Sequence, residues 1–445
     1  MLFIETTHVA IGGVGARQVR LAEALPSRGW RPVFALTQGR RFHDPIRYQK
    51  ALPPFDHQIL DGRSGSVDGR RLAINDVLHR VRPDVVLPGA VMDAWAVLES
   101  QKLNGNGPRI VYGLPGINVN TLGFLSHHSS SIDAGFGVGP LTERLLRDYC
   151  GLPDQRTFLV PTGVERATRR TSDNVSKPIR LLYVGRFDPD KRILDAIDLV
   201  DELCSRGVDF TLTLVGNGRH LAELESAAAK HDGRLVLAPP VSPKTLYESF
   251  YPEADAIMLF SEFEGLPNSV LEGMTHGLVP IVSEFRGLRE LGLFEDNQTA
   301  LLFAPKDISG AAQRVEELAA TAELKSAIGA RAKQLIERER SVDRMADRFV
   351  TVLERAIDGP PRIGDSEPIA APLETSRLRR VLGPRAAERV RRALGVGFDH
   401  PDASEWPLID NFVSDSPQDD ARRLNNAIAS FEASFKSDNG LACRT

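Results

Sequence analysis

Short apolar segments, each followed by a turn and then by a helical stretch, recur through both halves of this chain. Residues 1–6 are apolar and β-prone, and a glycine turn separates them from a helical stretch over 16–28. Residues 83–88 and 109–113 are similar short runs bounded by turn residues. Short buried strands that alternate with helices are typical of an α/β fold with a doubly wound parallel sheet.

A second series of this kind begins near residue 179. Its strands are expected at 179–185, 210–216, 235–237, 256–260 and 279–283. A polar stretch separates the two series and suits a linker between domains. At 445 residues, the chain also exceeds what one hydrophobic core usually supports.

The sequence therefore predicts two Rossmann-like domains and an appended part. The predicted parts are an N-terminal domain at 1–165, a linker at 166–178, a C-terminal domain at 179–340, a closing helix of the core at 341–358 and an extension at 359–445. The extension is rich in Pro, Ser and Asp and shows no strand-helix alternation, so we expect it to be partly helical or disordered.

Composition excludes several classes of function. Apolar residues make up 42% of the chain and charged residues 26%, with a net charge of −4, so no global field points to nucleic acid as a partner. Cys150, Cys204 and Cys443 form no CxxC pair, which argues against a zinc site or a disulfide framework and favours a reducing cytosol. An acidic residue at position 5 and the lack of an apolar run of ~20 residues predict a cytoplasmic protein whose membrane contact, if any, is peripheral.

The segment that carries most chemistry is Ser-Glu-Phe-Glu-Gly-Leu-Pro-Asn-Ser-Val-Leu-Glu-Gly-Met at 261–274, directly after an apolar strand. It predicts a strand, a glycine turn and a helix whose N-terminus opens at the edge of the sheet where ligands bind. Glu264 lies in the turn and Glu272 on the helix. One carboxylate can face a sugar ring while the other accepts hydrogen bonds from ribose hydroxyls.

This Glu-x7-Glu element resembles that of the retaining glycosyltransferases of family 4, which have the GT-B fold. The segment 184–191, Val-Gly-Arg-Phe-Asp-Pro-Asp-Lys, is similar to the family's Gly-Arg-loop-Lys segment. The resemblance covers about residues 1–355. It implies two Rossmann-like domains that face each other across a cleft. It also implies a retaining transfer of a sugar from a nucleotide diphosphate donor to a glycan, a lipid-linked acceptor or a small molecule.

The resemblance also implies site residues. Glu264 and Glu272 would be catalytic, and Arg186 and Lys191 would hold the donor diphosphate. The other donor-binding positions would be Gly265, Leu266, Asn268, Ser269, Val270, Gly287, Leu288 and Gly216, the last in a mainly structural turn. The acceptor side would carry Gly12 and Gly13, at the family's N-terminal glycine turn, with His127 or His128.

Two departures from the family pattern leave alternatives open. Arg286 replaces a glycine that usually lets backbone approach phosphate, so the loop is either shifted or its guanidinium binds phosphate itself. Gly113 stands where relatives often carry a histidine. His127 or His128 could take that role, although a solvent-facing loop histidine is the interpretation we favour for both.

We expect no metal and no cofactor beyond the nucleotide sugar. Asp188-Pro189-Asp190 spells the Asp-x-Asp metal pattern of a different glycosyltransferase fold, but a proline between two aspartates is also good turn chemistry. The alternatives to a family 4 enzyme are another GT-B enzyme, such as an epimerase or a glycogen synthase type, and a catalytically silent GT-B subunit that binds sugar nucleotides or serves as a scaffold.

Residues 376–394 form the most distinctive part of the extension. They carry seven arginines among leucine and valine residues, with Gly383-Pro384 as an interruption. This contrast suits an anionic membrane at the inner face of the cell, and the alternative is a helix packed on the core with solvated arginines.

Overall fold

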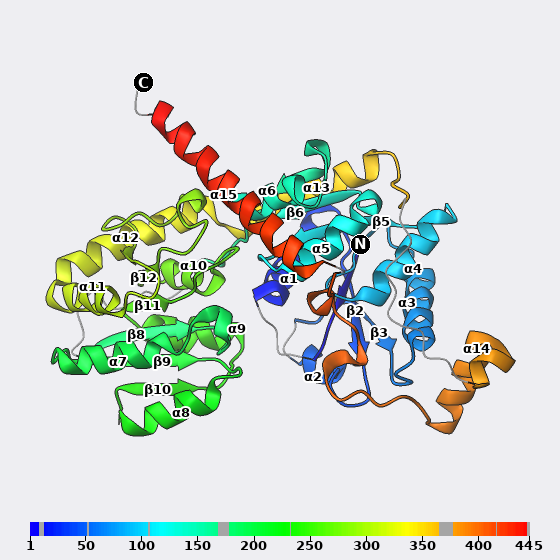
Figure 1. The fold of residues 1–445 in the computed structure, drawn as a ribbon, viewed down its shortest axis with the longest axis horizontal. Coiled ribbons are helices and arrows are strands. Elements are labelled where there is room, and N and C mark those ends of the chain that lie inside the picture. The colour runs from blue at the N-terminus through cyan, green and yellow to red at the C-terminus, as the bar shows by residue number, and fades with distance from the viewer. Residues whose placement is uncertain are drawn as a thin grey trace. The chain divides into compact units, whose positions relative to one another are not determined.

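The computed structural model describes residues 1–8, 13–50, 53–105, 107–167, 178–231, 233–364, 377–414 and 416–442 (Figure 1). The side chains of Ala403 and of residues 435–442 are not described. The chain forms two compact units, one of Met1–Val160 with Ala346–Thr445 and the other of Pro161–Met345, which we call unit 1 and unit 2. Most of the predicted linker, 168–177, lies outside the described residues.

Unit 1 contains a seven-stranded parallel sheet with the order β3-β2-β1-β4-β5-β6-β7. The strands are β1 (Leu2–Glu5), β2 (Val33–Gln38), β3 (His57–Asp61), β4 (Val85–Leu87), β5 (Arg109–Leu114), β6 (Ala134–Gly137) and β7 (Thr157–Leu159). The sheet is buried on both faces because helices cover it, which explains why β4 is apolar throughout and β1 is apolar up to its last residue, Glu5. The strands expected at 1–6, 83–88 and 109–113 are confirmed within one or two residues.

The helices of unit 1 begin at polar caps or prolines in several cases. Ser66 accepts a hydrogen bond from the Gly69 N–H at the start of α3, and Asn118 accepts two at the start of α5. The helices are α1 (Gly13–Ala24), α2 (Pro45–Gln49), α3 (Val67–Val81), α4 (Met92–Leu103), α5 (Val119–His128), α6 (Pro140–Asp148), α14 (Arg377–Leu394) and α15 (Pro417–Ala442), with 3-10 turns η1 (Pro26–Arg28), η2 (Ser129–Ser131), η3 (Asp154–Arg156), η8 (Ala403–Glu405) and η9 (Ile409–Asn411). A further helix, α13 (Val342–Asp358), begins at the end of unit 2 and continues in unit 1.

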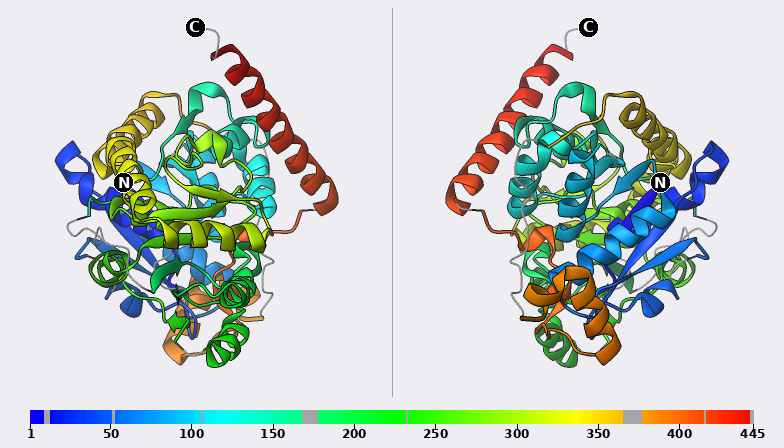
Figure 2. Two further views of the ribbon diagram at one scale, coloured as in Figure 1. Left: turned by 90° about the vertical axis from the view of Figure 1, so that its left-hand side faces the viewer. Right: turned by 90° about the vertical axis from the view of Figure 1, so that its right-hand side faces the viewer.

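The C-terminal extension belongs to the core of unit 1. Trp406, Ile409, Ile428 and Phe431 are buried in the same hydrophobic cluster as the strands β1 and β4. Figure 2 shows α15, in red, beside the helices α5 and α6, which it contacts. The expected interruption of the arginine-rich helix is confirmed, because Gly383 has φ 73° and kinks α14.

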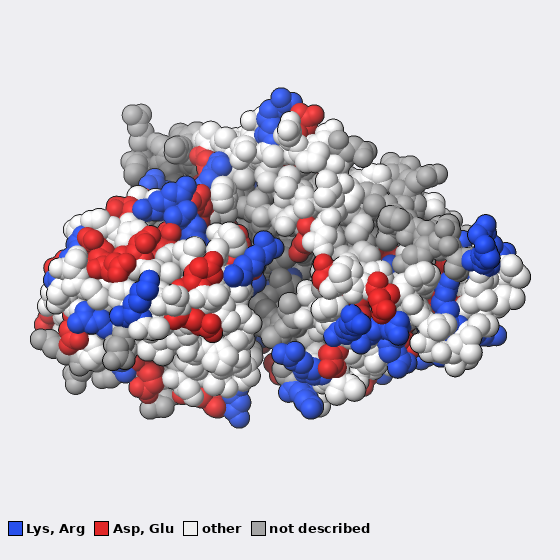
Figure 3. Space-filling model, turned by 60° about the horizontal axis from the view of Figure 1, so that its bottom comes forward, with Lys and Arg blue, Asp and Glu red and all other residues white. Residues whose placement is uncertain are grey.

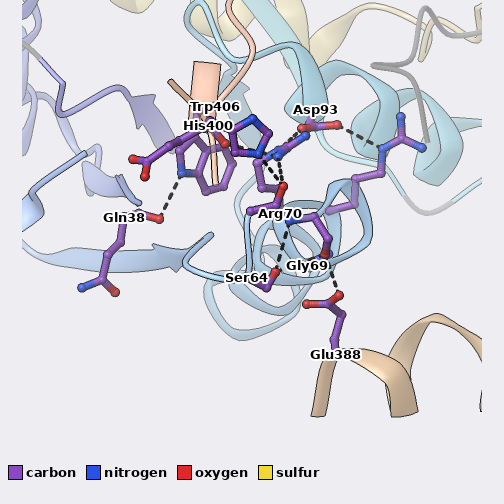
Figure 4. Close-up of polar contacts among 12 residues, drawn as sticks. Gln38, Ser64, Gly69, Arg70, Asp93, Glu388, His400 and Trp406 are labelled. Carbon is purple, nitrogen blue, oxygen red and sulfur yellow. Dashed lines mark hydrogen bonds and ion pairs between the residues drawn. The ribbon is translucent and has the colours of Figure 1, made fainter. Parts of the chain in front are cut away.

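Polar contacts fix the extension to unit 1 at several points (Figure 4). The indole N–H of Trp406 donates to the carbonyl of Gln38 at 3.1 Å. Arg70, which is 1% exposed, donates to Asp93 at 2.6 Å and to the carbonyl of Glu405 at 3.2 Å. From α14, Glu388 accepts a hydrogen bond from the Ser66 hydroxyl at 2.5 Å. The hydrogen bonds that involve Trp406, Glu405 and Glu388 form only when the extension is in place.

The Glu405 carboxylate has an unusual set of partners. It accepts hydrogen bonds from four consecutive backbone N–H groups, those of Arg40, Arg41, Phe42 and His43, at 2.8 to 3.4 Å. This carboxylate takes the place of water at four amides. It therefore anchors the loop after β2 to a residue more than 360 positions later in the chain.

Unit 2 contains a six-stranded parallel sheet with the order β10-β9-β8-β11-β12-β13. Its strands are β8 (Ile179–Val184), β9 (Phe210–Val215), β10 (Leu235–Ala238), β11 (Ala256–Leu259), β12 (Val279–Ser283) and β13 (Leu301–Phe303). The five strands expected in this part are all confirmed, within one residue of their predicted bounds.

The helices of unit 2 follow its strands as in a doubly wound fold. They are α7 (Asp195–Ser205), α8 (Leu221–Lys230), α9 (Pro243–Thr245), α10 (Asn268–Thr275), α11 (Ile308–Ala320) and α12 (Ala322–Glu339), with a π-helical turn η5 (Leu246–Phe250) and 3-10 turns η4 (Pro189–Lys191), η6 (Tyr251–Glu253) and η7 (Arg289–Leu291). In the part of the chain that the structure describes, no helix has the length and apolar character needed to cross a bilayer.

Candidate functional site

The candidate site of unit 2 lies at the carboxyl ends of β8 and β11, which are neighbours in the middle of the sheet. From β8 the sheet continues in one direction through β9 and β10, and from β11 in the other through β12 and β13. This point, where the strand order reverses, is where open α/β sheets bind ligands. The loops after both strands carry the residues that the sequence singled out.

Lys191 and Glu264 come from these two loops and meet. The Lys191 ammonium donates to Glu264 Oε1 at 2.7 Å, and the Ser261 hydroxyl donates to the same oxygen at 2.7 Å. The Glu264 side chain is 9% exposed and that of Lys191 21% exposed, so the pair is mostly shielded from water. Partial burial strengthens the attraction compared with a surface ion pair.

A second carboxylate in the β11 loop, Glu262, was not singled out from the sequence. It pairs with Arg192 at 3.0 Å and with Lys306 at 2.9 Å. These two cations keep the pKa of Glu262 below its usual range, with the hydrogen bond from Lys306 as the largest cause. Arg192 also holds Asp195 at the start of α7 at 2.8 Å, so this network braces the β11 loop against the β8 loop.

Arg186 lies in the β8 loop with its side chain 61% exposed. Its guanidinium pairs with Asp188 and, at 2.6 Å, with Asp190. Asp188 also accepts the backbone N–H of Arg219 at 3.1 Å. The two aspartates of the Asp-x-Asp sequence are therefore turned toward an arginine and a backbone amide, as their interpretation as turn residues implies. Among the described residues, no cluster of three or more His, Cys, Asp or Glu side chains has the arrangement of a metal site.

Arg286, the departure from the family's glycine, joins the same group of loops. It forms an isolated parallel bridge with Phe263, its N–H donates to the Glu262 carbonyl at 3.0 Å, and its guanidinium lies 5.7 Å from the centre of the Phe263 ring. Gly287 follows with φ 88°, a left-handed conformation that favours glycine, and Leu288 is 2% exposed. The loop after β12 is thus tied to the Glu264 loop.

The helix that the sequence predicts after the glycine turn is α10, which begins at Asn268 and carries Ser269 and Val270 in its first turn. Gly265 and Leu266 lie in the turn before it, where Leu266 is 7% exposed. The N–H groups of the first turn have no acceptor within the helix, and the positive end of the helix dipole lies here. Both make the start of α10 suitable for an anionic ligand.

Glu272 lies one turn further along α10 and is 7% exposed. Its Oε2 accepts a hydrogen bond from the hydroxyl of Tyr251 at 2.7 Å, and Tyr251 is fully buried. The tyrosine, which the sequence analysis missed, therefore fixes the orientation of this carboxylate.

Gly216, at the end of β9, is required by backbone packing. A Cβ atom at this position would lie 1.9 Å from the carbonyl oxygen of Gly185. The two glycines let the β8 and β9 loops pass each other closely, in keeping with the mainly structural role expected for Gly216.

The residues expected on the acceptor side belong to unit 1, and their positions agree with the expectation only in part. Gly12 lies outside the described residues, and Gly13 begins α1. His127 is exposed, but it lies on the helix α5 and not in a loop. His128 is fully buried, where it packs on Phe124 with ring centres 4.3 Å apart and contacts Glu99 at 2.7 Å. The interpretation of both histidines as loop residues is wrong, because the segment is helical and its apolar face carries His128 into the core.

The glycine at 113 also has a packing reason. A Cβ atom there would lie 2.3 Å from the ring of Phe136 on the neighbouring strand β6. The aromatic ring takes the space into which a larger residue at position 113 would project.

Comparison with known proteins agrees with this geometry. Residues 164–335 match the family model described as glycosyl transferases group 1. Over 152 residues, 32% of the chain, the sequence is 30% identical to the amylovoran biosynthesis glycosyltransferase AmsK of Erwinia amylovora, and over 144 residues it is 31% identical to a glycogen synthase of Mycobacterium tuberculosis. The matches span only 37% and 34% of those two proteins. They support a group 1 glycosyltransferase.

Solved structures extend the likeness to the fold. HepE of Anabaena, in complex with UDP and glucose, superposes with a TM-score of 0.62 over 79% of this chain and 98% of HepE, at 15% identity. Sucrose-phosphate synthase of Thermosynechococcus elongatus gives a TM-score of 0.64 over 80% of this chain and 98% of its own, also at 15% identity. With a Rossmann-like parallel sheet in each unit, the fold is GT-B.

Proposed function

We propose that this protein is a retaining glycosyltransferase, which moves a sugar from a nucleotide diphosphate donor to a glycan, a lipid-linked acceptor or a small molecule. The observation that carries the proposal is the contact between Lys191 and Glu264 at the carboxyl edge of the unit 2 sheet. It lies inside the segment that matches the group 1 family, and HepE, a structural neighbour, has been solved in complex with UDP-glucose.

The donor diphosphate would lie over the start of α10, where amide N–H groups and two nearby cations stabilise negative charge. Departure of the nucleoside diphosphate develops charge on its phosphate oxygens, and fixed cations and amide dipoles lower the energy of that state. Lys191 and Arg186 are the proposed cations. Glu264 would face the sugar, and Glu272 would accept hydrogen bonds from the ribose hydroxyls.

Retention of configuration means that the acceptor attacks the face from which the diphosphate departs. A phosphate oxygen of the leaving group would then take the proton of the acceptor hydroxyl, so that no separate base is required. Proton NMR of the newly formed product distinguishes the two outcomes, since a product with the anomeric configuration of the donor supports retention and the opposite configuration excludes it.

Donor binding provides the first test. Lys191→Ala and Arg186→Ala should each weaken binding of a nucleoside diphosphate in calorimetry by about 1.5–3 kcal/mol, the usual value of a charge-assisted hydrogen bond. Arg219→Ala is a matched control, because this exposed residue enters the site only through its backbone N–H. Unchanged affinity in both cationic variants would count against the assignment.

A catalytically silent subunit is the second candidate. It is favoured by the pairing of Arg186 with Asp188 and Asp190, which occupies the guanidinium, and by the ring of Phe136 beside Gly113. Release of nucleoside diphosphate from a sugar donor by the purified chain separates the candidates: a silent subunit binds the donor and never consumes it.

We also propose peripheral membrane contact through α14. Arg379 pairs with Asp68 in the first turn of α3, and Arg391 pairs with Glu388 on α14 itself, so these two arginines already have carboxylate partners. The exposed large apolar side chains of α14 are Val381 at 80%, Leu382 at 45% and Leu394 at 70%, and Val396, just after the helix, is 53% exposed. Figure 3 shows blue side chains separated by white ones at the right of the view, where α14 lies.

Sedimentation with phosphatidylglycerol vesicles tests this contact. Val381→Asp with Leu382→Asp should reduce binding at low salt, whereas Val413→Asp, at a position 69% exposed outside α14, should not. If the unmodified protein stays in the supernatant, the exposed face of α14 has another use and cytoplasmic localisation without membrane contact is the better description.

A further inference from the structure

The second feature that calls for a ligand lies in unit 1, at the carboxyl end of β1. This strand pairs with β2 on one side and with β4 on the other, so it marks the point where the strand order of the unit 1 sheet reverses. Glu5 is its last residue, and Arg17 and Gln18 follow on the helix α1. Open parallel sheets bind ligands at such a point.

These three side chains are buried with hydrogen-bonding capacity left over. Glu5 is 8% exposed, Arg17 3% and Gln18 4%. Within the part of the chain that the structure describes, Oε1 of Glu5, Nε and Nη1 of Arg17 and Oε1 of Gln18 have no hydrogen-bond partner. Buried polar atoms without partners are rare, and a buried charge without one is costly, so this concentration at a sheet edge is best explained by a ligand.

The surroundings of Arg17 fix its position without using its N–H groups. Its guanidinium lies 5.0 Å from the centre of the Phe136 ring on β6. The hydroxyl of Tyr112 on β5 is near enough to influence the pKa of Arg17. A guanidinium held over an aromatic face keeps its edge free for a planar or tetrahedral anion.

We propose that Arg17, Glu5 and Gln18 form a subsite for an acidic sugar, in which Arg17 binds a phosphate or carboxylate group and the other two bind neighbouring hydroxyls. The subsite names the substrate class of the acceptor and thus rests on the proposed function. Arg17 selects for a negatively charged group, and the oxygens of Glu5 and Gln18 select for hydroxyl groups. An acidic sugar carries both kinds of group in one molecule.

The charge of the subsite depends on pH. Burial raises the pKa of Glu5 to about 8, against the opposing effect of Arg17, so Glu5 is mostly neutral at pH 7 and the positive charge of Arg17 is uncompensated. The tyrosines facing the pair, Tyr48 from α2 and Tyr112 from β5, have raised pKa values and stay neutral. Burial lowers the pKa of His8, which also stays neutral, and the carboxylate of Asp410 in the extension acts on both His8 and Tyr112. Binding of an anion should therefore weaken as the pH rises through 8.

The test uses full-length protein with Arg186→Ala and Lys191→Ala, so that the proposed donor site does not bind the probes. Glucose 1-phosphate, glucuronate, inorganic phosphate and glucose are titrated in calorimetry. We expect the two acidic sugars to bind most tightly, Arg17→Gln to lose roughly ten- to a hundredfold in affinity for them, and Arg31→Gln, at an exposed position, to have no effect. The two acidic sugars also distinguish a phosphate subsite from a carboxylate subsite.

Three results would overturn the subsite: binding of neutral glucose as tight as that of the acidic sugars, unchanged affinity in Arg17→Gln, or affinity that does not change between pH 7 and pH 9. Since Arg17→Gln could fail to fold, the pH series is also run on protein with intact Arg17 and with Glu5→Gln, in which we expect the pH dependence to disappear. Failure of the proposed function is separate, because it would appear as an absence of donor binding and turnover whatever unit 1 binds.

Discussion

The ammonium nitrogen of Lys191 lies 2.7 Å from Oε1 of Glu264. In the proposed function one of these groups holds the diphosphate and the other faces the sugar, so each is held by the other before the donor arrives. The diphosphate must then compete with, or share, the cation of Lys191. This relationship separates binding from chemistry in a way that mutants can measure.

Glu264→Gln should lower sugar transfer by about a hundredfold or more, while its affinity for a nucleoside diphosphate without sugar stays equal or rises. The amide keeps the shape and the hydrogen bond to Ser261 but no longer neutralises Lys191. Calorimetry with UDP and a transfer assay give the two quantities, with Glu284→Gln at an exposed position as control. Weaker UDP binding in Glu264→Gln would contradict the competition.

Glu272→Gln should instead weaken nucleotide binding. The buried carboxylate is oriented by Tyr251, and the amide oxygen can still accept that hydrogen bond, so the fold should survive. Comparison of a nucleoside diphosphate with its 2′-deoxy and 3′-deoxy forms tests the role of the ribose. The unmodified protein should prefer the full ribose, and the variant should lose that preference. Equal preference in both proteins would remove Glu272 from the ribose contact.

Activity should persist in excess EDTA. The reason is that the carboxylates of Asp188 and Asp190 already pair with Arg186. Asp188 also accepts a hydrogen bond from the backbone N–H of Arg219. A metal ion would have to displace these partners. Loss of transfer on chelation that magnesium restores would refute this prediction.

Trp406→Ala should destabilise unit 1 by about 3–5 kcal/mol, since it removes a fully buried indole from the core. Unfolding in urea, followed together with nucleotide binding, should show an earlier transition for unit 1 and unchanged binding by unit 2. Val413→Ala, on the same extension but 69% exposed, should change the free energy of unfolding little. Equal stability of both variants would mean that the extension is not part of the core.

Stability should fall between pH 4.5 and pH 8 on account of Glu5. Burial raises its folded pKa to about 8 from an ordinary 4.5, so in this window the folded chain keeps a proton that the unfolded chain loses. The free energy of unfolding then decreases by up to about 1.4 kcal/mol per pH unit. Glu5→Gln should therefore gain stability relative to the unmodified protein at pH 8.5 but not at pH 4, whereas the exposed Glu354→Gln should follow the unmodified protein at both.

Much of the sheet structure follows from the sequence, because β4 and β11 are uninterrupted apolar runs, and β1 and β8 are apolar except for Glu5 and Arg180. The strand β6 escapes this logic. Two of its four residues are glycines, which are poor strand formers, and both are required by close contacts: a Cβ on Gly137 would lie 2.1 Å from the Glu143 nitrogen, and one on Gly135 2.6 Å from Leu152. Packing against the following helix explains this strand, and local propensity does not.

Part of the candidate site could be predicted from the sequence. A strand followed by a glycine turn and a helix places Glu264, Arg186 and Lys191 at one sheet edge, since the carboxyl ends of parallel strands share it. The sequence does not show that Lys191 pairs with Glu264 or that Tyr251 orients Glu272. Nor does it show that Nε and Nη1 of Arg17 are buried without a hydrogen-bond partner among the described residues. These are contacts between side chains from different loops, and only the folded chain determines them.

The position of Glu405 in the core of unit 1 affects the order in which the two units can fold during synthesis. Unit 2 is one continuous stretch of chain, whereas unit 1 needs residues up to Phe431 to close its core and to satisfy the amides after β2. On a ribosome, where chain emerges from the N-terminus onward, the first unit to be synthesised is thus the last that can finish folding. Its sheet must wait, with exposed apolar surface, until the chain has been translated beyond Phe431.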